Sequence, residues 1–337
     1  MSEPSLALQL DFYRALRRIR LTDERMQALQ RQGRIGFYGT CSGQEAVPVA
    51  LGFALRHSDW LFPALRESSV LLVRGFPLTQ YLAQVFGSER DVLKGRQMPS
   101  HMSGRAANVV SWSSCIGTQL THAVGAAWAA KLQRDDSVTV GCMGDGATSS
   151  ADFHSALNFA QVFRVPCVFV CQNNQWAIST PAARQCNTAT FAERALCYGM
   201  PSERLDGNDV VALYGAFQQA AQRARDGQGP TFLECVTYRM GPHSTSDDPT
   251  LYRSEAEVSA WRARDPILRL ARSLSSRGAL DTERIAAIDR ELTEELDTAL
   301  RVVEADPPPP RASLFDDVYA KLPTHLEEQR RALFALR

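Results

Sequence analysis

The chain has no net charge and no apolar run of the length that a transmembrane helix needs. Its 37 Lys and Arg residues balance 37 Asp and Glu residues, which removes the main compositional reason to expect nucleic acid or an anionic membrane as a partner. No repeat of solenoid length is visible along the 337 residues. The 45% hydrophobic and 22% charged residues are typical of a folded protein of one large domain or two modest ones.

The chain also lacks any C-x-x-C pair, although it has eight cysteines. Several of them lie in apolar, strand-like text such as VPCVFVCQ, so we expect small buried hydrophobic residues rather than zinc ligands or disulfides. The first residues, MSEPSLALQL, have neither the basic start nor the continuous apolar stretch of a secretory signal. These two absences predict a reducing, cytoplasmic location.

Residues 1–43 predict an N-terminal helical arm followed by a glycine-rich loop, GRIGFYGTCSG. Residues 6–32 have helical spacing, with a break or cap expected at Thr22-Asp23. The many arginines of this helix place it on a surface, where it is a candidate contact for a partner subunit.

Residues 44–306 predict an α/β domain with helices at its C-terminal end. Its central unit is a strand, a GDG turn, a helix and a second strand, which implies a parallel sheet with a right-handed crossover. A further helix and strand repeat this rhythm. The expected helices are 44–55, 117–132, 149–163, 209–225 and, with breaks, 255–304; the strands are 137–143, 167–172 and 231–238; and 88–112 is an extended loop.

Residues 307–337 begin with four consecutive prolines, a stiff extended spacer. The tail beyond them, starting LFDDVYAKLP, has apolar residues of its own. We therefore expect a tail that docks on a neighbouring subunit.

The GDG turn, Gly144-Asp145-Gly146, lies between a strand and a helix N-terminus, the geometry of a diphosphate site. Taken alone, the motif is more often a type I′ turn. The carboxylate of Asp145 would repel a bare diphosphate, so a phosphate site here needs a hard cation, for which Mg²⁺ is the usual choice.

A second polar loop, NNQW, follows the next strand, so the crossover brings it to the same edge of the sheet as the GDG turn. Asn174 offers an amide oxygen, and an irregular loop offers a backbone carbonyl. With Asp145 these give three oxygen donors and leave positions for diphosphate and water, as octahedral Mg²⁺ requires. The two loops together are much more specific than either alone.

The segment GDGATSSADFHSALNFAQVFRVPCVFVCQNNQWAISTP resembles the thiamine-diphosphate motif of 2-oxoacid dehydrogenase E1 α subunits. KGRQMPSHM, LDGNDV and HSTSDDP extend the resemblance over most of the chain, nearest the branched-chain (2-oxoisovalerate) type. It implies an oxidoreductase with a thiamine-diphosphate-binding α/β fold, a parallel sheet flanked by helices, and helical N- and C-terminal extensions. It also implies thiamine diphosphate, Mg²⁺ and K⁺, an E1 β subunit in an α2β2 heterotetramer, and acyl transfer to a lipoyl-bearing E2.

The resemblance assigns roles residue by residue. It implies Mg²⁺ bound by Asp145, Asn174 and the backbone carbonyl of Trp176, and His243 as the catalytic histidine; imidazole is also the usual proton-transfer group near neutral pH. The implied cofactor-binding residues are Arg66, Gly144, Gly146, Ala147, Asn174, Arg239 and His243. The implied potassium loop is Ser113, Cys115, Thr118 and Gln119.

The chain departs from the family pattern near the site. Gln175 stands where the family usually has glycine, Cys115 where it has proline, and Ala64-Leu65 where the branched-chain type has Gln-Tyr. Two alternatives to a branched-chain enzyme therefore stay open: pyruvate or acetoin as the substrate, and a non-catalytic paralogue that acts in assembly. No second module for the pyrimidine half of the cofactor is visible, so we expect the chain to be inactive alone.

Overall fold

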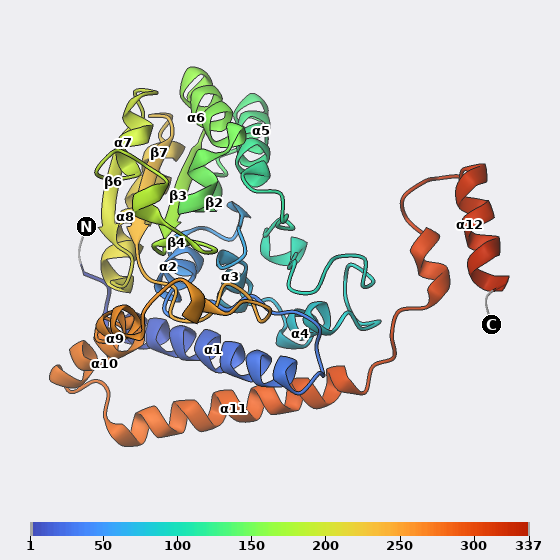
Figure 1. Ribbon diagram of the computed structural model, residues 1–337. Helices are drawn as coiled ribbons and strands as arrows, with labels where there is room; N and C mark the ends of the chain where they lie inside the picture. The colour runs from blue at the N-terminus through green and yellow to red at the C-terminus, as the bar shows by residue number, and fades with distance from the viewer. Residues whose placement is uncertain (1–2, 336–337) are drawn as a thin grey trace.

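The computed structural model describes residues 3–335 and has a five-stranded parallel sheet covered by helices on both faces (Figure 1). The strand order is β1-β2-β3-β7-β6, and all four neighbouring pairs are parallel. The strands are β1 (Trp60–Phe62), β2 (Thr139–Gly144), β3 (Cys167–Asn173), β7 (Thr231–Val236) and β6 (Ser202–Asp206). The α/β fold expected from the sequence is confirmed.

The central strands form where the sequence is apolar on both faces, because a sheet covered on both sides buries its inner strands. The edge strand β6 is polar, SERLD, and has no buried residue. Each residue of β3 is buried, as its continuous text CVFVCQN predicts. The register pairs Gly144 with Gln172 and Asn173 with Val236, so β2, β3 and β7 end close to one level. The loops after these strands therefore open at one edge of the sheet.

Alternate residues of the strands face two separate cores. One core joins Val140 and Val168 to α2 (Ala46–Ala54) and α8 (Val210–Arg225). The other joins Phe169 to α5 (Thr118–Gln133), α6 (Ala151–Phe163) and α7 (Ala192–Leu196). The two-layer cover fixes the sheet, and with it the edge from which the loops project.

The N-terminal helix α1 (Leu6–Arg31) is uninterrupted, so the break expected at Thr22-Asp23 is wrong. Both residues are buried inside the helix, and the Thr22 hydroxyl donates to the Arg18 carbonyl, 2.8 Å away. The Asp23 carboxylate accepts hydrogen bonds from the Tyr38 hydroxyl (2.8 Å) and the Cys41 amide (2.5 Å). Long-range bonds to the following loop thus hold polar residues that a local pattern would place at a helix end.

Most arginines of α1 are paired within the chain, although several stay partly exposed; contact of this helix with a partner subunit stays a prediction. Most of the paired arginines lie beside acidic side chains of the long helix α11 (Thr282–Glu304), which runs along α1 (Figure 1). Arg17 forms two hydrogen bonds to Asp289, of 2.8 and 2.7 Å. The remaining pairs between these helices are Arg14–Glu291, Arg18–Glu295 and Arg25–Asp297. Most of the arginine charge of α1 is therefore matched within the chain.

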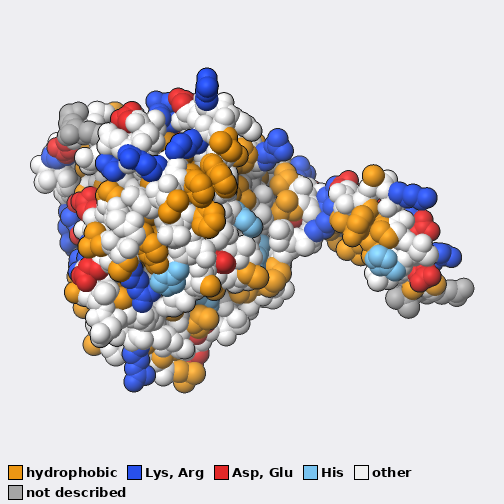
Figure 2. Space-filling view, turned by 90° about the horizontal axis from the view of Figure 1, so that it is seen from above, with side chains coloured by type: hydrophobic (Ala, Val, Ile, Leu, Met, Phe, Trp, Pro, Cys, Tyr) orange, Lys and Arg blue, Asp and Glu red, His pale blue; other side chains and the backbone are white. Residues whose placement is uncertain are grey.

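The C-terminal tail stands apart from the body in both views (Figures 1 and 2). Near the start of the spacer, Arg90 pairs with Asp306 at 2.7 Å, and further along Arg96 pairs with Asp317 at 3.2 Å. The tail ends in α12 (Thr324–Ala335), which has no buried residue. Docking of this tail on another subunit stays a prediction, as do the domain boundaries at 43 and 306.

The shorter elements complete the chain. They are α3 (Val70–Val73), α4 (Leu78–Phe86), β4 (Trp176–Ala177), β5 (Thr180–Pro181), α9 (Glu255–Arg262), α10 (Pro266–Ser276), and the 3-10 helices Glu67–Ser69, Arg105–Ala107, Asp145–Ser149, Ala182–Arg184, Pro249–Leu251 and Arg311–Phe315. Between residues 3 and 335 no helix is both long and apolar enough to cross a membrane.

Five cysteines are buried as expected; Cys115 and Cys197 are exposed and Cys186 is half-buried, which corrects the expectation for these three.

Candidate active site

A cavity of about 480 Å³ opens at the carboxyl ends of β2 and β3. It is the edge at which parallel α/β sheets bind their ligands. Most of the site residues expected from the sequence line it: Arg66, Ser113, Gln119, Gly144, Asp145, Gly146, Ala147, Asn174, Trp176 and His243. The two polar loops, which are separated by a helix and a strand, thus share one cavity.

The GDG turn begins a 3-10 helix, Asp145–Ser149. Gly144 has φ −87°, so the turn is not of type I′, which needs a positive φ. A Cβ atom at Gly146 would lie 2.7 Å from the Cβ of Ala177, so the close approach of the next loop requires glycine. Asp145 is buried, and burial raises the pKa of its carboxyl group above the ordinary value.

The NNQW loop turns sharply after β3. The Asn174 amide donates to Gln44 Oε1 (2.8 Å), and its Oδ1 accepts from the backbone N–H of Trp176 (3.1 Å). Gln175 has φ +73°, the left-handed region that favours glycine, which gives a physical reason for the family preference noted above. Asn174 and Trp176 of this loop line the same cavity as Asp145.

These three residues offer oxygens that fit a hard divalent cation, because carboxylate, amide and carbonyl oxygens are the ligands that Mg²⁺ prefers. Among residues 3–335, no group of three or more His, Cys, Asp and Glu is arranged to hold a metal ion.

A buried positive charge borders the same cavity. The Arg66 guanidinium donates to the backbone carbonyls of Thr40 and His243, the latter 2.6 Å away. Within the described part of the chain, no carboxylate lies at salt-bridge distance from it. Burial, reinforced by Arg239, lowers the pKa of Arg66 to about 10, so it remains charged at neutral pH. A buried cation without a carboxylate partner favours an anionic ligand, as a diphosphate is.

His243 lies beside this arginine, with Nδ1 3.4 Å from Arg66 Nη2. Its backbone N–H donates to the Asp247 carboxylate (2.6 Å), which fixes the loop. Burial and then the charge of Arg66 lower the pKa of the imidazole to about 4. The ring is therefore neutral at pH 7.

Arg239 is fully buried and holds the backbone of the cavity wall in place. Its guanidinium donates to the carbonyls of Trp176 (3.0 Å) and Ile178 (2.6 Å) and to the Tyr252 hydroxyl (2.7 Å). It thus holds the loop that carries one of the expected metal ligands. Its direct contact with a cofactor stays a prediction.

The loop expected to bind potassium lies at the same wall. Ser113 and Gln119 line the cavity, and the Cys115 amide donates to Ser113 Oγ (3.1 Å). Thr118 is the first residue of α5. The Gln119 amide donates to the Cys142 carbonyl (2.8 Å), while its buried Oε1 has no hydrogen-bond partner among residues 3–335. This free oxygen suits a cation; its occupancy by potassium stays a prediction.

Several cavity residues escaped the sequence analysis. Glu67 is buried at the wall, and desolvation raises the pKa of its carboxyl group to about 7. Gln172, at the end of β3, has a buried Oε1 without a partner in the described chain. Behind the cavity wall, His101 of the KGRQMPSHM motif is stacked on the wall residue Trp112, with 3.9 Å between the ring centroids, and its Nε2 lies 2.5 Å from Ser114 Oγ. Of the two cavity residues, Gln172 had a sequence signal, because it directly precedes the NNQW loop, whereas Glu67 had none.

Comparison with known proteins agrees with this architecture. A family model described as the dehydrogenase E1 component matches residues 13–312. The chain is 46% identical to the 3-methyl-2-oxobutanoate dehydrogenase subunit alpha of Mycobacterium tuberculosis, over 91% of this chain and 81% of that one. It is 42% identical to the 2-oxoisovalerate dehydrogenase subunit alpha of Pseudomonas aeruginosa, over 95% of this chain and 80% of that one.

A third relative, the mitochondrial 2-oxoisovalerate dehydrogenase subunit alpha 2 of Arabidopsis thaliana, is 42% identical over 92% of this chain. The chain spans 66% of the length of that relative. With a family match that covers most of the sequence and a fold that brings the two motif loops together, the chain belongs to the dehydrogenase E1 component family.

Proposed function

We propose that this chain is the α subunit of an E1 component that decarboxylates branched-chain 2-oxoacids with thiamine diphosphate and Mg²⁺. The E1 β subunit of an α2β2 heterotetramer and a lipoyl-bearing E2, which receives the acyl group, are its partners. The observation that carries the proposal is the buried Arg66, which borders the same cavity as the oxygens of Asp145, Asn174 and Trp176. An anion site next to a hard-cation site is what a metal-bound diphosphate needs.

The cofactor, when bound, supplies the carbanion chemistry that lets CO₂ leave a 2-oxoacid. The chain's own residues bind and orient it. Arg66 and the backbone of Gly146 and Ala147 are placed for the diphosphate, and the three oxygens for Mg²⁺. The free Oε1 of Gln119 supports a potassium ion in the loop 113–119.

His243 is the group placed to hold and move a proton. Burial, and then the charge of Arg66, lower the pKa of its imidazole to about 4. An anion bound at Arg66 would offset the repulsion from this arginine and move the pKa of the imidazole towards neutrality. Cofactor binding would in this way prepare the histidine for proton transfer at physiological pH.

The substrate end of the cavity favours aliphatic chains. Ala64 and Leu65 line it where the branched-chain type has Gln-Tyr, and Trp112, Ile116 and Ile178 add apolar surface. An apolar pocket discriminates weakly between aliphatic chains, since one methylene is worth only about 1–3 kcal/mol. We expect overlapping activity on several branched 2-oxoacids. The names of the relatives above support this substrate class.

The test is CO₂ release with an artificial electron acceptor, measured for the chain alone and after assembly with its β subunit. The chain alone should be inactive, because no second module for the aminopyrimidine half of the cofactor is visible in its sequence, and the β subunit should restore turnover. Strict preference for pyruvate would refute the substrate class. Absence of thiamine-diphosphate binding in the assembled protein would favour a non-catalytic paralogue.

The cellular location belongs to the same proposal. The five buried cysteines are free thiols, which suits a reducing compartment such as the cytoplasm. Fractionation of the source cells, with an antibody against the chain, tests this location. Recovery with the membrane or a secreted fraction would contradict it.

A further inference from the structure

One side chain outside the family motifs contacts the proposed metal ligand directly. Gln185 follows the β4–β5 hairpin and the short 3-10 helix Ala182–Arg184. Its Nε2 donates to Asp145 Oδ2 at 2.6 Å and also approaches the Thr180 carbonyl at 3.2 Å. The bond is short and joins an amide to a buried carboxylate, so it fixes the rotation of that carboxylate.

A second residue anchors both partners of this bond. Arg194, on α7, donates to the Gln185 carbonyl (2.7 Å) and to the carbonyl and hydroxyl oxygens of Thr148 (2.6 and 2.8 Å). Thr148 lies in the 3-10 helix that Asp145 begins, and its hydroxyl donates to the Asp145 carbonyl at 2.7 Å. One guanidinium therefore ties the segment of Gln185 to the turn of Asp145.

We propose that Gln185 is a positioning residue, held by Arg194, that orients the Asp145 carboxylate for its divalent cation. This inference rests on the proposed function, because it needs a cation at Asp145. Side chains that orient metal ligands commonly change metal affinity by about 10- to 100-fold when they are removed. Mg²⁺ demands near-ideal octahedral geometry, whereas the larger Ca²⁺ accepts irregular ligand sets. A loosened carboxylate should thus harm Mg²⁺ binding more than Ca²⁺ binding.

The experiment measures the binding of thiamine diphosphate to the assembled enzyme by calorimetry, at a series of Mg²⁺ or Ca²⁺ concentrations. Gln185→Leu keeps the size of the side chain but removes its donor. We expect the Mg²⁺ concentration needed for half-maximal binding to rise about tenfold or more, and the Ca²⁺ concentration to rise clearly less. Arg194→Met should also raise the Mg²⁺ and Ca²⁺ concentrations needed for half-maximal binding, because the Gln185 segment loses its anchor.

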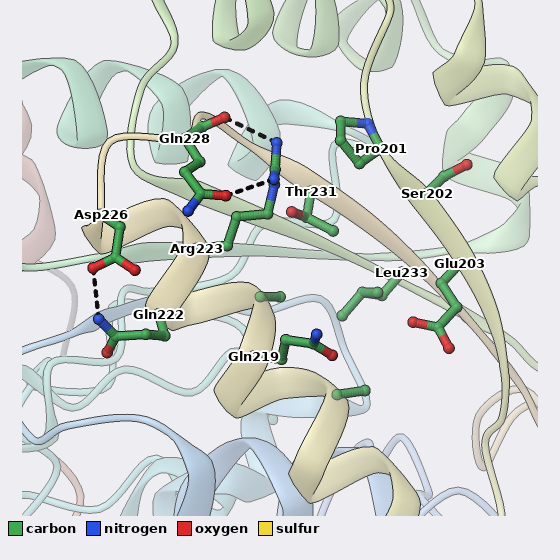
Figure 3. A pocket seen from close by; sticks show the side chains of 12 residues that line it. Pro201, Ser202, Glu203, Gln219, Gln222, Arg223, Asp226, Gln228, Thr231 and Leu233 are labelled. Carbon is green, nitrogen blue, oxygen red and sulfur yellow. Dashed lines mark hydrogen bonds between the residues drawn. The ribbon is translucent and has the colours of Figure 1, made fainter. Parts of the chain in front are cut away.

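The matched control removes a similar bond far from the site. Gln222, on α8, donates to Asp226 at 2.7 Å on the wall of a second cavity, of about 440 Å³ (Figure 3). Gln222→Leu should leave both metal requirements unchanged. Equal losses for Mg²⁺ and Ca²⁺ in Gln185→Leu, or no loss at all, would overturn the inference. If the unmodified enzyme binds no thiamine diphosphate, the proposed function itself fails, which is a distinguishable result.

Discussion

Replacement of the buried Glu67 by glutamine should change how the stability of the chain depends on pH. The carboxyl group is 1% exposed, and Oε2 accepts the Ala64 amide at 3.2 Å, a bond that the oxygen of glutamine can also accept. Desolvation raises the pKa from an ordinary 4.5 to about 7 in the folded chain. Glu67→Gln keeps the shape of the side chain and removes its titration.

Whether the free energy of unfolding rises or falls with pH depends on whether the folded or the unfolded chain binds the proton of Glu67 more tightly. Below pH 4.5 the group is protonated in both the folded and the unfolded chain, so it opposes folding least there. Between pH 4.5 and 7 the unfolded chain releases the proton while the folded chain keeps it, and the free energy of unfolding falls. At about 1.36 kcal/mol for each pH unit, this interval corresponds to a loss of about 3 kcal/mol.

The assay is guanidinium unfolding of the cofactor-free chain, followed by tryptophan fluorescence between pH 5 and pH 8.5. The advantage of Glu67→Gln over the unmodified chain should grow by about 2–3 kcal/mol across this range. Glu328→Gln, at an exposed position on α12, is the control and should follow the unmodified chain throughout. A constant difference between Glu67→Gln and the unmodified chain would refute the reasoning, since it would show that Glu67 does not titrate in this range.

Two further predictions concern the site. Asp145→Ala should lower Mg²⁺-dependent affinity for thiamine diphosphate by at least about tenfold, because a metal ligand is lost. The circular dichroism spectrum should stay unchanged, because no core side chain is lost. Calorimetric binding as strong as that of the unmodified enzyme would show that Asp145 is not a metal ligand. His243→Ala should slow acyl transfer to lipoyl groups by about 100-fold or more, because general acid–base catalysis commonly contributes factors of this size. The affinity for the cofactor should change much less. An unchanged rate of reductive acylation in single-turnover measurements would count against a proton-transfer role.

The centre of the fold could be predicted because its signals are local. The strand before Gly144, the helix that Ser150 caps, and the strand before Asn173 each have their own period and punctuation. The parallel crossover then brings the two loops to one edge without any further information. The side chains of Asp145 and Asn174 consequently meet at the cavity as the sequence predicts.

The features that could not be predicted depend on contacts between distant segments. Glu67 begins a one-turn 3-10 helix and Gln185 caps the C-terminal end of another, and such short elements have no periodicity that tells which way a side chain points. Arg239 could be assigned to the site by resemblance, but its contact with the Trp176 carbonyl comes from the packing of one loop on another. The pairing of α1 with α11 could not be predicted because Arg17 and its partner Asp289 are 272 residues apart.

That separation matters while the protein is being made. The apolar side of α1, with Phe12 and Leu16, packs in the same core as α2, which leaves the ribosome soon afterwards. The arginine side of α1 can be covered only after α11 has been synthesised. At roughly 5–20 residues per second, Asp289 is synthesised about a quarter of a minute to a minute after Arg17. Charged side chains stay hydrated during such a delay, whereas apolar ones would invite aggregation. The side of the helix that is covered last therefore carries charged side chains. A nascent chain of about 280 residues, which lacks the acidic partners of α11, presents arginines there rather than an apolar surface.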